Sequence, residues 1–279
     1  MTIISSLIVF VFGLIIGSFL NVLIYRYNTG KGVNGRSMCL SCGSTLKWQD
    51  MFPLISFLKL LGRCRHCKAK ISYQYFFVEL ATGIVFVLTC ARLIQMGFLG
   101  LTDSEAILNF VIYLGAMSIL VAIFVYDLRH KIIPDGLVYT FTILALLRII
   151  SSVYFMNIGP YPWFVDIVSG ALPTLFFAGL WYFSGGKWMG LGDGKLVLGM
   201  SWLLPFSQNF AAIFIAFWAG AVIGILLMLG SRIFSKFSKN PIKMKTELPF
   251  APFLISSLFV VFLFGITLND IFSYFQFNF

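Results

Sequence analysis

Two aspartates, Asp127 and Asp193, stand at the ends of long uncharged stretches of the chain. Asp127 follows the uncharged run Ala106–Tyr126, and Asp193 lies just before the uncharged run Leu196–Ser231. Two carboxylates that share a site repel each other when both are ionised, so the pair holds a single proton. The ionised member can then deprotonate an attacking water while the protonated member hydrogen-bonds a peptide carbonyl oxygen. The pair therefore indicates peptide hydrolysis of the aspartic-protease kind.

Structural roles would also explain both aspartates. Asp127 would be a charge at the membrane boundary paired with Arg129 or Lys131, and Asp193 would be a helix N-cap favoured by the helix dipole. Acidic residues within a membrane are functional by default, which favours catalysis. Three glycines around Asp193 would let the backbone approach another helix or a substrate strand closely. These glycines are Gly190, Gly192 and Gly194.

Four of the five cysteines form two CxxC pairs. They are Cys39, Cys42, Cys64 and Cys67. Two such pairs about twenty residues apart are typical of zinc sites, because each pair gives two thiolates to one tetrahedral ion. Two disulfides, redox-active thiols or unligated thiols are the alternatives, and disulfides are rare in the cytoplasm. We expect a closed, structural zinc site that holds the shape of its loop. The fifth cysteine, Cys90, lies in an apolar stretch and is expected to be a small buried hydrophobe.

The composition places these residues in a membrane protein. Hydrophobic residues make up 59% of the 279 residues and charged residues 11%, whereas soluble domains carry about 25% charged residues. A soluble globule, a disordered tail and a collagen-like fibre are thereby excluded. We predict an all-α polytopic membrane protein with about eight transmembrane helices and a small zinc-binding cytoplasmic loop.

The spans follow from runs of roughly 20 apolar residues, the length that crosses a bilayer core. The run Leu196–Ser231 is too long for one crossing, and Pro205 is expected to divide it into two helices. The first of the two is short and can cross only if Asp193 lies in a water-accessible recess. The other expected spans are Met1–Tyr25, Tyr73–Ile94, Ala106–Tyr126, Gly136–Tyr154, Ile167–Gly186 and Leu248–Asn269.

The predicted organisation is a first transmembrane helix in residues 1–27, a cytoplasmic four-cysteine loop in 28–72 and a helical bundle in 73–279. Met1–Tyr25 has no basic n-region and no small-residue cleavage site, so it is expected to be retained as a span. With the N-terminus outside, the inner segments contain every basic residue except Arg92 and Arg148. The positive-inside rule is then satisfied. The net charge of +10 is therefore explained by orientation, and no nucleic-acid partner is expected.

The chain resembles the type IV prepilin peptidases over nearly its whole length. Asp127 is followed by Ile133-Pro134-Asp135, and Asp193 closes a GxGD motif. The other segments that carry the resemblance are Gly17–Arg26, the CxxC loop with Gly62–Cys67, Val78–Leu80, and Pro249–Leu254 with Ala251 where the family most often has Gly.

The resemblance implies a membrane aspartic endopeptidase with Asp127 and Asp193 as its catalytic residues. Its substrates would be type IV prepilins or pseudopilins, whose basic leader it would remove after a Gly at the cytoplasmic face of the bacterial inner membrane. It would serve type IV pilus biogenesis, type II secretion or competence. The resemblance also implies N-methylation of the new N-terminus with S-adenosylmethionine, an activity linked to the cysteine loop. The sequence does not indicate which residues would bind the methyl donor.

A basic cytoplasmic face would repel a basic leader. We therefore expect a local acidic patch, with Glu79 assisting substrate recognition or docking of the zinc loop. Its candidate members are Asp50, Glu79, Asp135 and Glu247.

Two other classes of protein are compatible with the same residues. One is a proton- or cation-coupled transporter that uses Asp127 and Asp193 as a relay, and the other is a zinc-stabilised membrane scaffold. Relays more often place their acids at the membrane midplane. Both aspartates are expected at the inner edge, which favours the protease.

Overall fold

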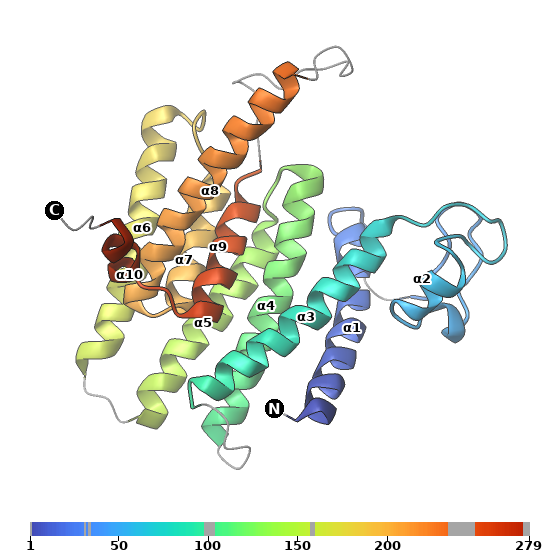
Figure 1. The fold of residues 1–279 in the computed structure, drawn as a ribbon, viewed down its shortest axis with the longest axis horizontal. Coiled ribbons are helices and arrows are strands. Elements are labelled where there is room, and N and C mark those ends of the chain that lie inside the picture. Colours follow the sequence, from blue (N-terminus) through green and yellow to red (C-terminus); the bar gives the residue numbers. More distant parts are fainter. Residues whose placement is uncertain are drawn as a thin grey trace. The chain divides into compact units, whose positions relative to one another are not determined.

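Apolar α-helices form most of the computed structural model, which describes residues 2–30, 32, 35–97, 104–156, 160–233 and 249–275 and has no β-strand among them. Helices suit this sequence because every backbone polar group in a bilayer core must be bonded within its own segment. The elements are α1 (Ile3–Arg26), η1 (Trp48–Asp50), α2 (Ile55–Lys59), α3 (Tyr73–Gln95), α4 (Ser104–His130), α5 (Asp135–Met156), α6 (Pro160–Ser184), α7 (Leu191–Leu203), α8 (Phe206–Ile233), α9 (Ala251–Phe264) and α10 (Leu268–Phe275) (Figure 1).

Six of these helices, α1, α3, α4, α5, α6 and α8, are long and apolar enough to cross a membrane. The helices α7, with 13 residues, and α9, with 14, are shorter. The predicted all-α membrane fold is confirmed, and these eight helices correspond to the eight predicted spans. Several residues predicted for the inner face lie outside the described residues, namely Lys236, Lys239, Lys243, Lys245 and Glu247.

Two helix boundaries show how local chemistry divides the apolar runs. Leu204, at the C-cap of α7, is extended, and α8 begins directly after Pro205, so the break predicted at this proline is confirmed. The last predicted span, Leu248–Asn269, is shorter than expected. Its helix α9 ends at Phe264 because Gly265 adopts the left-handed conformation with φ +68°, which favours glycine and terminates helices.

The chain divides into two compact units, residues 1–125 and 126–279. In the first unit α1 packs against α3. A Cβ added at Gly17 would lie 2.7 Å from the Cα of Glu79, and one added at Gly13 would lie 2.8 Å from the Cα of Gly83. Glycines are thus required for the two backbones to approach this closely. Cys90 is buried in the core with Phe86, as expected for a small hydrophobe.

In the second unit α7 packs against both α5 and α6, and α8 packs against α9. A buried polar cluster joins three of these helices. The hydroxyl of Ser201 on α7 donates to the Asn209 side-chain oxygen on α8 (2.8 Å), and the Asn209 amide donates to the Ser169 carbonyl on α6 (3.1 Å). Because buried polar groups in an apolar core are costly unless bonded, these contacts hold the short helix α7 in place among its neighbours.

Candidate active site and metal centre

Asp127 lies in the last turn of α4, and its side chain is buried with 3% of the residue exposed. Its carboxylate accepts a hydrogen bond from the backbone N–H of Ala251, the first residue of α9. Its Oδ2 atom is buried and has no hydrogen-bond partner among the described residues. An orphaned buried carboxylate oxygen is uncommon and indicates strain, a catalytic role or an absent ligand.

Asp193 is the third residue of α7, whose N-cap is Gly190. The residue is 7% exposed, and its carboxylate accepts a hydrogen bond from the backbone N–H of Gly190. An acidic side chain at this position that reaches back to the N-cap N–H forms half of a capping box. The N-cap role considered for Asp193 is therefore wrong, because the N-cap is Gly190, three residues earlier. The Asp193 carboxylate nevertheless accepts the backbone N–H of Gly190, a donor at this helix end that would otherwise be unbonded.

The glycines around Asp193 mostly serve close packing. A Cβ added at Gly192 would lie 3.1 Å from the Cβ of Ile133, and one added at Gly194 would lie 3.3 Å from the Cβ of Phe177 on α6. The predicted close approach to another helix is confirmed at Gly194, whereas Gly192 packs against the turn between α4 and α5. A Cβ at Gly190 would meet only Asp193 Oδ2 at 3.5 Å and the Gly192 nitrogen at 3.9 Å.

The turn after α4 and the start of α7 meet. Asp127 lies in the last turn of α4, just before this turn, and Asp193 lies at the start of α7. Beyond the contact between Gly192 and Ile133, the ammonium of Lys195 lies 2.8 Å from a carboxylate oxygen of Asp135, the first residue of α5. The charge of Asp127 acts electrostatically on Asp193. Two buried carboxylates within electrostatic range can share a proton, which is the arrangement that activates water in acid–base hydrolysis.

Three contacts of this site involve residues to which the sequence assigned no such role. Ala251 supplies the N–H that binds Asp127, Ile133 packs on Gly192, and Lys195 pairs with Asp135. The sequence did contain a signal for the contact between Ala251 and Asp127. Pro252 favours a helix start at Ala251, and the N–H of a residue at a helix start has no partner within the helix. The phenyl ring of Phe250, the N-cap of α9, packs 5.2 Å from that of Phe217 on α8 and fixes this helix end.

The four cysteines predicted to bind metal converge in the first unit. The Sγ atoms of Cys39, Cys42, Cys64 and Cys67 all lie within 4.8 Å of one another. The Sγ atoms of Cys39 and Cys67 are 3.9 Å apart, and a tetrahedral zinc ion with Zn–S bonds of about 2.3 Å requires sulfurs about 3.8 Å apart. The geometry fits a four-thiolate metal site, and all four cysteines are free of disulfides.

The two CxxC pairs have the same backbone geometry. The N–H of Gly43 donates to the carbonyl of Cys39, and the N–H of Lys68 donates to the carbonyl of Cys64. Gly43 and Lys68 both have positive φ, +69° and +57°. The backbone therefore turns tightly after the second cysteine of each pair. Each pair is therefore a self-contained turn that presents two thiols to one point.

Hydrogen bonding favours the metal-binding form of one thiol. The Ser44 hydroxyl lies 3.0 Å from the Sγ of Cys42. The side chain of Ser44, followed by its backbone N–H, lowers the pKa of the Cys42 thiol to about 6. This hydrogen bonding favours the thiolate of Cys42, which is the form that binds metal.

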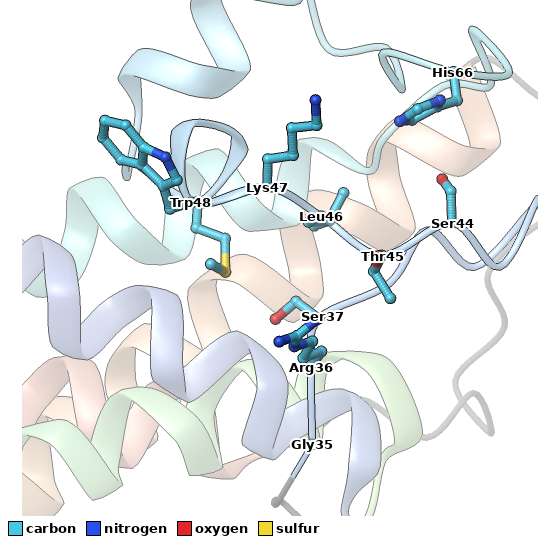
Figure 2. Close-up of a pocket in the computed structure, with 10 residues that line it drawn as sticks. Gly35, Arg36, Ser37, Ser44, Thr45, Leu46, Lys47, Trp48 and His66 are labelled. Carbon is cyan, nitrogen blue, oxygen red and sulfur yellow. The ribbon is translucent and has the colours of Figure 1, made fainter.

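A hollow of about 820 Å³ opens beside the cysteine cluster. Figure 2 shows His66 near Ser44 at one end and Trp48 at the other, with Arg36 and Lys47 between them. His66 therefore lines this hollow and is not a member of the four-cysteine cluster. The hollow offers an indole ring, two cationic side chains and hydroxyls to a ligand.

The described members of the expected acidic patch each have a local partner. Asp50 is bound by Arg65 at 2.6 Å. The buried carboxylate of Glu79 accepts the backbone N–H of Leu54 at 2.8 Å. Glu79 on α3 thus docks the loop that contains the cysteines.

Comparisons with known proteins match both parts of the chain. Residues 11–93 match the family model for the bacterial peptidase A24 N-terminal domain, and residues 112–225 match that of the type IV leader peptidase family. No solved structure matches.

Similar proteins come from several bacteria and carry the same name, prepilin leader peptidase/N-methyltransferase. The Myxococcus xanthus protein is 32% identical over 232 residues, 81% of this chain and 64% of that protein. The Klebsiella pneumoniae protein is 33% identical over 207 residues, 70% of this chain and 83% of that protein. The Bacillus subtilis protein is 28% identical over 260 residues, 92% and 94% of the two chains.

The match spans less than two thirds of the Myxococcus xanthus protein and 53% of a Vibrio cholerae protein of the same name. It spans most of the Klebsiella pneumoniae protein at 33% identity. With its paired CxxC turns, its GxGD helix start and these relatives, the chain belongs to the type IV leader peptidase family.

Proposed function

We propose that the protein is a membrane aspartic endopeptidase that cleaves the basic leader from type IV prepilins and pilin-like proteins. The observation that best supports this proposal is that Asp127 and Asp193 are both buried and that the charge of Asp127 acts on Asp193, while one oxygen of Asp127 has no hydrogen-bond partner among the described residues. The names of the relatives support the choice of a prepilin as substrate.

In the proposed reaction one carboxylate is ionised and the other holds the shared proton. The ionised one removes a proton from a water, whose oxygen attacks the scissile carbonyl carbon, while the protonated one hydrogen-bonds the carbonyl oxygen. The C–N bond then breaks and the leaving amine takes up a proton from the pair. The N–H groups of Ala251 and Gly190 hold the two carboxylates in place without themselves changing charge.

We further propose that the protein is a multi-pass protein of the bacterial inner membrane with its N-terminus outside. The cysteine loop and both aspartates would then lie at the cytoplasmic side. This orientation is supported by the positive-inside rule, because it leaves only Arg92 and Arg148 among the basic residues toward the outside.

We assign the four thiolates to a zinc ion, which would cross-link the two CxxC turns. This ion would have a structural role, because four cysteine ligands leave no open position for substrate. The loop between α1 and α3 is too small for a large core of its own, so a metal cross-link would largely determine its shape.

N-methylation of the new N-terminus is the second proposed activity. S-adenosylmethionine supplies an electrophilic methyl group when bound. We place it in the hollow beside the cysteines, whose volume suits such a ligand. Trp48 offers a stacking surface for an adenine ring, and Arg36 can pair with a carboxylate.

Both proposed activities can be tested by incubating the purified protein in detergent with a prepilin and isotope-labelled S-adenosylmethionine. We expect loss of the leader after Gly and a labelled methyl on the new N-terminus, both read by mass spectrometry. Asp193→Asn should cleave far more slowly than wild type, yet should methylate pilin that has already been cleaved, whereas Trp48→Ala should cleave but methylate poorly. If wild type leaves the prepilin intact but carries protons across vesicles, the transporter alternative is correct.

A further inference from the structure

Residues 52–61, here called the interfacial segment, present an apolar surface outside the helices that cross the membrane. Lys59 is their only charged residue. Phe52, Ile55, Leu58 and Leu61 are all exposed, from 48% for Phe52 to 86% for Leu61. Ile55 and Leu58 are three apart on α2 and therefore lie on one face. An apolar surface of this kind marks an interaction site.

The segment is held against the first two turns of α3. The N–H of Leu54 donates to Glu79 at 2.8 Å, and the Phe57 ring packs 5.6 Å from the rings of both Tyr73 and Phe76. Tyr73, Phe76 and Glu79 are spaced by three residues along one face of α3. The segment therefore runs beside the end of a helix that is long and apolar enough to cross the bilayer.

This attachment sets the depth of the segment. The end of a membrane-spanning helix lies at the boundary between hydrocarbon and water, where aromatic residues gather. Tyr73 and Phe77, in the first two turns of α3, are 70% and 62% exposed, as expected for side chains that face lipid. The exposed side chains of Ile55 and Leu58 flank Phe57, the residue that packs against α3, and lie on the same short segment. Figure 1 shows α2 in the loop that joins the end of α1 to the start of α3.

The surrounding charge favours anionic lipid. The sequence between residues 35 and 72 contains seven basic residues and one acid, Asp50, which is already bound by Arg65. The basic residues are Arg36, Lys47, Lys59, Arg63, Arg65, Lys68 and Lys70. Basic residues next to an apolar face are characteristic of segments that lie in the interface of an anionic membrane.

We propose that the interfacial segment inserts Ile55, Leu58 and Leu61 into the adjoining leaflet and thereby anchors the cysteine loop to the membrane surface. Glu79 fixes the segment from the protein side, and anionic headgroups bind the surrounding lysines and arginines. The cysteine cluster is then held at a constant height above the bilayer. This anchoring does not depend on the chemistry proposed for Asp127 and Asp193.

The test places the photoreactive amino acid p-benzoylphenylalanine at Leu58 in the full chain. The protein is reconstituted into bilayers of phosphatidylethanolamine and phosphatidylglycerol, with prepilin present, and illuminated. The matched control carries the same amino acid at Leu40, which is 78% exposed in the first CxxC turn. Retained metal content confirms that both variants are folded.

We expect lipid adducts at Leu58 on the order of tenfold above those at Leu40, with phosphatidylglycerol enriched over its share of the bilayer. Equal lipid adducts at both positions would overturn the proposal. So would adducts at Leu58 that consist mainly of prepilin or of a second copy of the chain. Adducts that follow the bulk lipid composition would contradict the role given to the basic residues.

Discussion

The side chain of Lys195 binds that of Asp135 at 2.8 Å, and this pair joins the helix that carries Asp193 to the start of α5, the helix that follows the one carrying Asp127. Lys195 lies two residues after Asp193, and Asp135 begins the helix that follows the turn after Asp127. The ammonium of Lys195 also lies 5.4 Å from the centre of the Tyr139 ring. The ion pair and the contact between Gly192 and Ile133 therefore fix one segment against the other.

We expect this ion pair to contribute modestly to catalysis by positioning Asp193. The Asp135 side chain is 59% exposed, so solvent screening limits the coupling between the two residues to about 0.5 kcal/mol. A double-mutant cycle with Lys195→Met and Asp135→Asn, measured as kcat/KM for prepilin cleavage, should reveal this coupling. Lys195→Arg serves as the conservative control and should retain activity. Strictly additive effects of the two substitutions would show that the pair positions nothing.

Gly17→Ala should destabilise the first unit. The added Cβ would lie 2.7 Å from the Cα of Glu79. This Cα is a backbone atom and cannot move aside as a side chain can, so α1 and α3 must separate. Such overpacking costs about 1–3 kcal/mol. Thermal unfolding in detergent should show the loss. Gly179→Ala on α6 is the matched control, since its added Cβ would meet nothing within 4 Å; equal stability of both variants would contradict the close packing.

Substitutions at Glu79 should separate docking of the loop from substrate recognition. Glu79→Gln retains an oxygen that can accept the Leu54 N–H, whereas Glu79→Leu removes it and leaves that amide without its partner. Amide hydrogen exchange at Leu54 should therefore accelerate in Glu79→Leu and stay slow in Glu79→Gln. Unchanged cleavage and methylation kinetics in Glu79→Gln would eliminate a role for its charge in substrate recognition.

Metal binding should require all four cysteines. We expect one zinc ion per chain, and cobalt substituted for zinc should give the intense sulfur-to-metal charge-transfer bands of a four-thiolate site. Cys42→Ser should lower the metal content and weaken these bands. Cys90→Ser should leave the metal content unchanged, because Cys90 is buried in the helical core and is not a member of the cysteine cluster. Equal metal content in Cys42→Ser and wild type would exclude the proposed ligand set.

Much of this architecture could be predicted from the sequence because apolar runs, proline and paired cysteines act locally. The break at Pro205 and the convergence of the CxxC turns are examples. The shortness of α9 was not predicted, because Gly265 lies within an otherwise apolar run and only its left-handed backbone reveals the helix end. The bonds from Ala251 to Asp127 and from Lys195 to Asp135 span 124 and 60 residues. Such long-range pairs depend on how the helices pack, which periodicity and spacing do not determine.

Cleavage of a prepilin by Asp127→Asn and Asp193→Asn tests the central claim most directly. Each asparagine keeps an oxygen that can accept the N–H of Ala251 or Gly190, so the fold is preserved while the shared proton is lost. Single-turnover rates of leader loss should fall about a thousandfold in each variant. Asp270→Asn is the control and should cleave at the wild-type rate. Asp270 is an exposed residue in the first turn of α10, and its carboxylate accepts the backbone N–H of Thr267. Persistent cleavage by either Asp127→Asn or Asp193→Asn would contradict the assignment of the two aspartates as the catalytic pair.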